Sequence, residues 1–171
     1  MTPASGVKLT VGEPFPNIQV ERRKKKEGRL ITCILSSAAF RNVKFGIVLS
    51  LPYYTPETDK AHLSSFNEHR QTFNDLNCRI IIISSEDPGF SCFVPKLDLK
   101  GSVLVSAHNR KYGAITGLED KPCDFHYSLA RSCVIVRNGI VEAVSVETNK
   151  DECTVTSAAA TIEKIKEIMK K

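Results

Sequence analysis

The stretch that decides the fold runs from Phe45 to Ser85 and reads FGIVLSLPYYTPETDKAHLSSFNEHRQTFNDLNCRIIIISS. It begins and ends with apolar runs that are typical of buried strands. The segment between them follows helical spacing at Leu63, Phe66, Arg70, Phe73 and Leu76. Two buried strands joined by an amphipathic helix predict a right-handed β-α-β crossover with parallel strands. Chemistry in such a unit lies at the carboxyl end of the first strand, which here is the corner PYYTPETDK.

The start of the predicted helix is well specified. Thr55-Pro56 or Thr58-Asp59 provides a cap, and Glu57 and Asp59 suit the positive end of the helix dipole. A helix N-terminus can hold an anion or lower the pKa of a thiol. The residue in position for that role is Thr58, and the sequence has no cysteine between residues 33 and 78. On residue type alone, Thr58 is interpreted as an ordinary cap.

Length and composition predict one domain spanning residues 1–171. The chain is 42% hydrophobic and 25% charged, which is enough apolar mass for a core and enough charge for solubility. No apolar run approaches the length of a membrane span, and residues 1–11 lack the apolar core of a leader. We therefore expect no membrane partner. The net charge of +5 permits an acidic partner without requiring one.

Six widely spaced cysteines without a Cys-x-x-Cys pair predict reduced thiols in the cytoplasm or another reducing compartment. Those at strand-like positions are interpreted as small buried hydrophobes: Cys33, Cys78 and Cys133. Cys123 and His126 form a single Cys-x-x-His pair with no second pair at metal-ligand spacing. We predict neither a metal nor another cofactor.

The remaining elements are short. Extended segments are predicted at VGEPFPNIQVE, RLITCILS and SVLVS, and a short helix in AHNRKYGAITG closed by Gly113. Asn138-Gly139 is the favoured two-residue turn of a β-hairpin within RSCVIVRNGIVEAVSVE. The segment around Cys92 has room for one or two helical turns before Pro95. A C-terminal helix starts at a Thr or Ser cap, with one face formed by Ala158, Ile162, Ile165 and Met169.

The densest basic run is ERRKKKEGR, which contains Arg22, Arg23, Lys24, Lys25 and Lys26. Between two strands, such a run is typical of a solvated loop. Contact with RNA through residues 22–26 is the alternative, although the interleaved aromatic residues of many nucleic-acid sites are missing.

The order of these elements resembles the thioredoxin-like layout with N-terminal strands added. Five stretches resemble the peroxiredoxin (redoxin) family, closest in pattern to thiol peroxidases and atypical one-domain peroxiredoxins: VGEPFPNIQV, SLPYYTPET, KYGAITG, SLARSCVIVRNGIVEAVSVE and the helix after CTVTSAA. The resemblance implies an α/β fold, a three-layer sandwich around a central mixed sheet. A thioredoxin-type reductase is disfavoured, because the corner has no Cys-x-x-Cys and Leu129-Ala130 stands where thioredoxins have a proline.

The family's corner reads proline, three residues, threonine, two residues, and then the peroxide-reducing cysteine. Its threonine falls on Thr55 and its cysteine on Thr58, whereas its proline falls on Leu51, one residue before Pro52. The arginine that steadies thiolate and peroxide falls on Arg131. A thiol of pKa about 8.5 is readily made acidic by a helix end and an arginine. An alcohol has no such route without a dedicated base, and we expect the nearest histidine, His62, to be exposed.

The replacement at Thr58 leads to the hypothesis of a peroxiredoxin-like domain that has lost peroxidase activity and serves as a binding or assembly component, with a protein partner or a homodimer. The alternative is an antioxidant thiol peroxidase that uses another cysteine and has peroxide as its substrate. Cys92 lies near the position at which some thiol peroxidases have a resolving cysteine. Cys133 shares a strand face with Arg131 but lies deeper in the core. The minor alternative is a ribonucleoprotein component that contacts RNA through the basic run.

Overall fold

The computed structural model describes residues 6–23, 30–52, 55–85, 103–106, 110–120 and 128–171. The chain begins with two paired strands, and a second pair of strands precedes the last helix. The elements are β1 (Ile18–Arg23), β2 (Leu30–Leu35), the 3-10 helix η1 (Ser37–Phe40), β3 (Phe45–Leu51), α1 (Pro56–Glu68), α2 (Arg70–Asp75), β4 (Cys78–Ser84), β5 (Val103–Ser106), α3 (Lys111–Thr116), β6 (Ser132–Arg137), β7 (Ile140–Val146) and α4 (Ala158–Met169).

Within the described residues, seven strands form one mixed sheet in the order β2-β1-β5-β4-β3-β6-β7. The central strands β3 and β4 are parallel, with Phe45 opposite Cys78, and β6 lies antiparallel on the other side of β3. Every residue of β3 is buried, as expected for a strand covered on both faces. The predicted β-α-β unit, with the hairpin antiparallel beside it, is confirmed.

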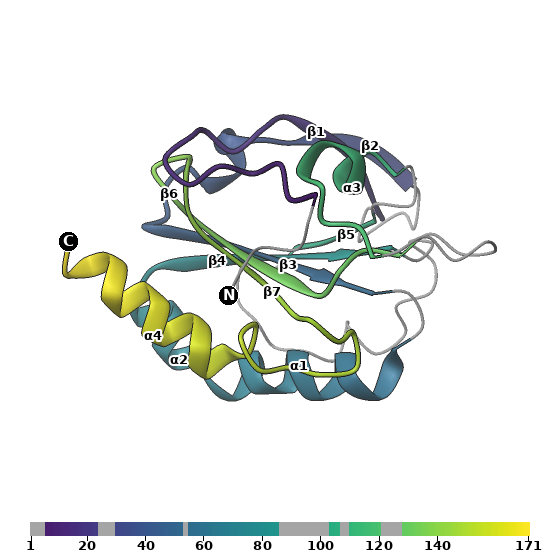
Figure 1. The fold of residues 1–171 in the computed structure, drawn as a ribbon. Coiled ribbons are helices and arrows are strands. Elements are labelled where there is room, and N and C mark those ends of the chain that lie inside the picture. The colour runs from purple at the N-terminus through teal and green to yellow at the C-terminus, as the bar shows by residue number, and fades with distance from the viewer. Residues whose placement is uncertain (1–5, 24–29, 53–54, 86–102, 107–109, 121–127) are drawn as a thin grey trace.

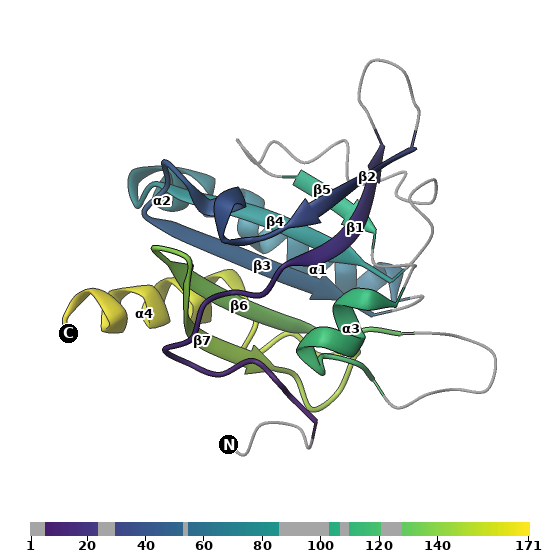
Figure 2. The same cartoon turned by 90° about the horizontal axis from the view of Figure 1, so that it is seen from above.

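Two layers cover the sheet, so the predicted three-layer α/β architecture is confirmed (Figure 1). Helices α1, α2 and α4 lie on one face, and α3 lies on the other together with the β1–β2 hairpin, which is joined to the sheet at β5 (Figure 1). Figure 2 shows the hairpin crossing the sheet and extending past the other strands where β1 ends and β2 begins. Each face has its own apolar cluster, one including Ile18, Val20 and Leu35, the other Leu63, Phe66 and Ile165.

The predicted helical pattern between β3 and β4 is two helices. Helix α1 ends at Glu68 and α2 begins at Arg70, with His69 at a non-helical φ of −96° and ψ of 15° between them. The buried rings of Phe66 and Phe73 stack across this break with their centroids 5.1 Å apart. Arg70, which fits the helical spacing, is exposed, because the break turns it away from the core.

Turns were predicted with mixed success. Asn138 and Gly139 both have positive φ, 55° and 78°, which is the two-residue hairpin turn expected between β6 and β7. The prediction that Gly113 closes the short helix is wrong. Gly113 lies buried inside α3, and Gly117 ends the helix with a left-handed φ of 72°. At Gly117 the main chain also lies so close to Gly6 and Lys8 that a Cβ would not fit.

Helix α4 begins as predicted with a serine cap, since Ser157 Oγ accepts a hydrogen bond from the Ala160 amide at 3.2 Å. Ala158, Ile162 and Ile165 are buried against the sheet. The placement of Met169 on this face is wrong, because 43% of it is exposed. At the last turn Ile168 is the buried residue instead, next to β7.

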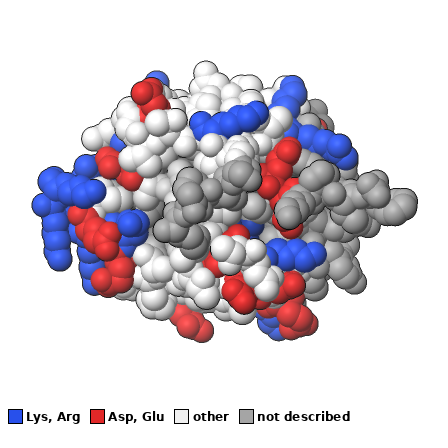
Figure 3. Space-filling model, in the orientation of Figure 1, with Lys and Arg blue, Asp and Glu red and all other residues white. Residues whose placement is uncertain are grey.

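Charged side chains are mixed over the face shown in Figure 3, where Lys and Arg gather mainly over the C-terminal end of α4. Lys164 and Lys166 in that group are paired with Glu167 and Glu163. The basic residues there are therefore partly neutralised. Among the helices of the described ranges, none is long and apolar enough to cross a membrane.

Candidate functional site

The corner between β3 and α1 is organised by Thr55. Pro56 is the first residue of α1, as its fixed φ favours, and Thr55 is the N-cap, with φ −125° and ψ 58°. The Thr55 hydroxyl makes no capping bond. It donates instead to Asp59 Oδ1 at 3.0 Å, one turn along the helix. The side chain expected to cap the helix is thus part of a polar network.

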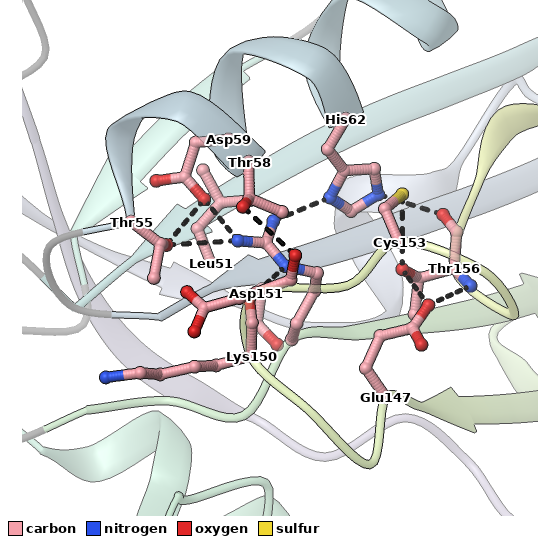
Figure 4. A network of polar contacts seen from close by, with 12 residues as sticks. Leu51, Thr55, Thr58, Asp59, His62, Glu147, Lys150, Asp151, Cys153 and Thr156 are labelled. Atoms are coloured by element: carbon pink, nitrogen blue, oxygen red, sulfur yellow. Dashed lines mark hydrogen bonds and ion pairs between the residues drawn. The ribbon is translucent and has the colours of Figure 1, made fainter.

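The centre of that network is the guanidinium group of Arg131, which comes from the residue before β6 and is fully buried. Its Nη2 donates to Asp59 Oδ1 at 2.7 Å and to Thr55 Oγ1 at 3.0 Å (Figure 4). Its Nε donates to the Lys150 carbonyl at 3.0 Å. Its Nη1 lies 3.0 Å from His62 Nδ1. Each of the three guanidinium nitrogens therefore has a partner within the protein.

The contact with Arg131 fixes the tautomer of His62. A guanidinium has only donors, so His62 Nδ1 must be the unprotonated acceptor. The proton is then on Nε2, which donates to the Thr156 carbonyl at 2.8 Å. Burial, together with the positive charge of Arg131, lowers the pKa of His62 to about 4. His62 is therefore a neutral, buried hydrogen-bonding group near neutral pH.

Asp59 provides the counter-charge, with a side chain only 8% exposed. Burial raises the pKa of this carboxyl group above its usual value, against the lowering effects of Arg131 and of the hydrogen bonds from Arg131 and Thr55. Desolvation thus offsets a large part of the attraction in this ion pair, as is usual for buried pairs. What the pair does fix is the position of α1 relative to β6.

The segment after β7 closes the network from the other side, and Glu147 holds that segment in place. Its Oε1 accepts from the amide groups of Thr154 and Thr156 at 2.6 and 2.9 Å and from the Thr156 hydroxyl at 2.9 Å. The Thr154 hydroxyl donates to Oε2 at 2.8 Å. Burial alone would raise the pKa of Glu147, but these hydrogen bonds outweigh it and lower the pKa. Glu147 thereby holds Thr156, whose carbonyl group binds His62.

Of the corner residues predicted from the sequence, the structure brings Thr55 and Arg131 together. Thr58, the third residue of α1, is half-buried and is not the helix cap. Its hydroxyl donates to the Asp151 carbonyl at 3.2 Å. The expectation that His62 is exposed is wrong, since its relative exposure is 0%.

Two groups of candidate residues lie wholly or partly outside the described residues. Cys92, Cys123, His126 and Lys24–Lys26 fall in ranges that the structure does not describe. Arg22 and Arg23 are the last two residues of β1, and Arg22 is exposed.

Sequence reasoning missed the roles of Asp59, His62 and Glu147. For the first two a signal was present, because Thr55, Asp59, His62 and Phe66 repeat at helical spacing and continue the buried stripe of α1 toward its start. Glu147 gave no comparable signal. It is bound by Thr154 and Thr156, which lie in an irregular segment without helical or strand spacing.

No thiol in the described part of the chain is made acidic by its surroundings. Burial raises the pKa of Cys78 and of Cys133 to about 12. It also raises the pKa of Cys33 and of Cys153, although Arg131 opposes the rise for the latter. Cys153 Sγ lies 3.8 Å from Thr156 Oγ1, at the edge of the network. The four described cysteines are free, and the same residues include no cluster of His, Cys, Asp and Glu that could hold a metal ion.

Comparison with solved structures identifies the fold. The reduced Prx3 of Vibrio vulnificus in complex with hydrogen peroxide superposes with a TM-score of 0.77 at 16% identity, over 94% of this chain and 98% of that one. A protein of Burkholderia cenocepacia, provisionally described as a thioredoxin reductase, gives 0.76 at 18% identity, over 91% and 96%. The 1-Cys peroxiredoxin of Plasmodium falciparum gives 0.73 at 18% identity, over 93% and 99%.

These similarities establish the thioredoxin-like fold in the form that peroxiredoxins have. No protein-family model matches the sequence, and no curated protein sequence matches it significantly. At 16–18% sequence identity, the structural similarity shows the fold of this chain but not its chemical activity.

Proposed function

We propose that this chain is a member of the peroxiredoxin family whose corner has become a structural centre, and that it acts as a binding or assembly component without peroxidase activity. The observation that carries the proposal is the state of Arg131. In the peroxiredoxin family, the arginine at the matching position steadies a thiolate and a peroxide. Here its guanidinium group is buried and bound to Asp59, Thr55, His62 and the Lys150 carbonyl.

The chemistry of the corner supports the same proposal. Peroxide reduction needs a polarisable nucleophile that is ionised near neutral pH, and a thiolate meets that need. The residue at the matching position is Thr58, whose hydroxyl donates to a carbonyl group. Within the described residues, the imidazole of His62 does not serve as its base, because the unprotonated nitrogen is directed at Arg131. The negative charge of Asp59 also disfavours a second anion at Arg131.

A second candidate function is a thiol peroxidase that uses Cys92. The hydrogen bond between Arg131 and Thr55 favours it, since these two residues match the family's pattern. An RNA-binding role through residues 22–26 has only the charge of that run in its favour.

The binding role and the peroxidase role are separated by measuring hydrogen peroxide consumption with dithiothreitol as the reductant. We expect the wild-type protein, Cys92→Ser and the matched control Cys123→Ser all to consume peroxide at the rate of dithiothreitol alone. Turnover in the wild type that is lost in Cys92→Ser and kept in Cys123→Ser would assign a peroxidase function to Cys92 and refute the proposal.

A further inference from the structure

The turn between β6 and β7 lies beside η1 (Figure 2), and a pocket of about 320 Å³ opens between them. Residues 37 and 40–43 line it on one side, and Asn138 and Gly139 line it on the other. This η1 pocket lies at the opposite end of β6 from the Arg131 network, because Arg131 precedes the strand and Asn138 follows it. Its volume is at the lower end of the range of small-molecule sites.

Both walls of the η1 pocket are held by contacts from outside it. Arg79 Nη1 donates to the Ala39 carbonyl of η1 at 2.5 Å. The Phe15 amide donates to the Gly139 carbonyl at 2.8 Å and so fixes the hairpin turn. The two walls meet at Gly139, where a Cβ atom would come within 2.9 Å of Ser37 Cβ. The pocket is therefore preorganised, which lowers the cost of binding a ligand.

The charge at the η1 pocket is positive and uncompensated. None of the residues that line it is acidic, and the exposed side chain of Arg41 is one of them. Arg41 makes no side-chain hydrogen bond or ion pair with any described residue. Arg79, which holds η1 from behind, likewise has no acidic partner in the described ranges. By contrast, Arg137 at the end of β6 is paired with Glu142 at 3.1 Å. The pocket thus favours an anion.

Uncharged donors surround the same pocket. Asn42 and Asn138 are exposed and have left-handed φ angles of 66° and 55°. Neither their main-chain amides nor their side-chain amides have a hydrogen-bond partner in the described part of the chain. Main-chain amides in turns of this kind form concave sites for anions. Together with the planar fork of Arg41, they match the several acceptor oxygens of a phosphate group better than the two oxygens of a carboxylate.

We propose that the η1 pocket binds a small phosphate monoester. The guanidinium group of Arg41 binds two phosphate oxygens, the amides of Asn42 and Asn138 bind the remaining one, and half-buried Val43 contacts the group that carries the ester. The size of the pocket favours a small molecule over a segment of another protein. This site goes beyond the binding role proposed above and shares no residue with the Arg131 network.

The test titrates the full chain with inorganic phosphate and with phenyl phosphate at constant ionic strength, followed by the NMR signals of the main-chain amides. We expect the largest changes at Asn42 and Gly139, and tighter binding of phenyl phosphate because its ring contacts Val43. Arg41→Gln should weaken the binding of both probes at least about tenfold, through loss of charge-assisted hydrogen bonds. Arg70→Gln is the matched control, because Arg70 is also exposed and lies outside the pocket.

A second variant tests the other wall. Asn138→Asp keeps the hairpin turn, since Asp-Gly is also favoured there, and adds a negative charge at the pocket. We expect it to weaken the binding of phosphate at least about tenfold by repulsion. Asn149→Asp is its control, because Asn149 is exposed in the segment after β7, and the change keeps the oxygen that accepts from the Asp151 amide.

Several results would overturn the proposal. Unchanged signals at Asn42 and Gly139, or equal weakening by Arg41→Gln and Arg70→Gln, would show that the pocket is not a site. Equal binding of the two probes would exclude recognition of an ester. Changes centred on the lysines of α4 that vanish at high salt would show non-specific attraction. A phosphoserine peptide that binds more tightly than phenyl phosphate would assign the pocket to a phosphorylated protein. None of these results affects the peroxide measurement, so the two proposals fail separately.

Discussion

Replacing Asp59 with asparagine tests how strongly the folded state depends on the Arg131 network. The change keeps the size and one acceptor oxygen of the side chain but removes the charge facing a guanidinium group that is fully buried. Removing one partner of a buried ion pair costs about 3–5 kcal/mol, because the other charge stays buried without compensation. Thr55, His62 and the Lys150 carbonyl still bind Arg131, so we expect about 3 kcal/mol, the lower end of that range.

The assay is urea denaturation at pH 7, followed by circular dichroism and extrapolated to water. Glu142→Gln is the matched control, because its ion pair with Arg137 is 25–30% exposed and should be worth less than about 1 kcal/mol. A double-mutant cycle of Asp59→Asn with Arg131→Met should give a coupling of about 1–3 kcal/mol. A loss at Asp59 no larger than that at Glu142, or a coupling near zero, would refute the structural role assigned to the network.

Three further predictions concern the same region and the thiols. Burial and Arg131 lower the pKa of His62 from 6.5 to about 4. The contribution of neutral His62 to the free energy of unfolding should therefore be fully present above pH 6.5, and the free energy should fall by up to about 3 kcal/mol as the pH decreases to 4. Urea titrations should show this loss, and an equally large loss in His62→Gln would contradict the prediction. Thr58→Cys should gain slow peroxide reduction, and adding Asp59→Asn should raise that rate by removing a negative charge that disfavours a thiolate beside Arg131; stopped-flow rates that fall or stay unchanged would count against the assignment. Alkylation of Cys133 at pH 7 should be far slower in the native protein than in urea, since its pKa is about 12, and equal rates by mass spectrometry would show the thiol to be accessible.

The parts of the fold that the sequence predicts correctly are local or periodic. The apolar runs of β3 and β4, the turn at Asn138-Gly139 and the cap at Ser157 each depend on residues within one element or one turn. The break at His69 was not predicted, because the apolar spacing continues from Phe66 to Phe73 although the main chain is not helical at His69.

The candidate site was predictable only where the family pattern supplied it. Thr55 and Arg131 were placed by resemblance, and the structure puts a hydrogen bond between them. The burial of His62 depends on a carbonyl group more than 90 residues away, at Thr156. No local rule for helix α1 contains that information. The expectation that His62 is exposed failed because a buried polar residue is satisfied by whatever the rest of the fold brings to it, which the spacing of α1 does not contain.

The measurement that tests the central claim most directly is single-turnover stopped-flow mixing of fully reduced wild-type protein with hydrogen peroxide. If the Arg131 centre is structural, the protein should consume peroxide no faster than the same concentration of free thiol, and Arg131→Met should leave that rate unchanged. A wild-type rate well above that of free thiol, lost in Arg131→Met while the variant stays folded, would show that the centre is catalytic and would contradict the account.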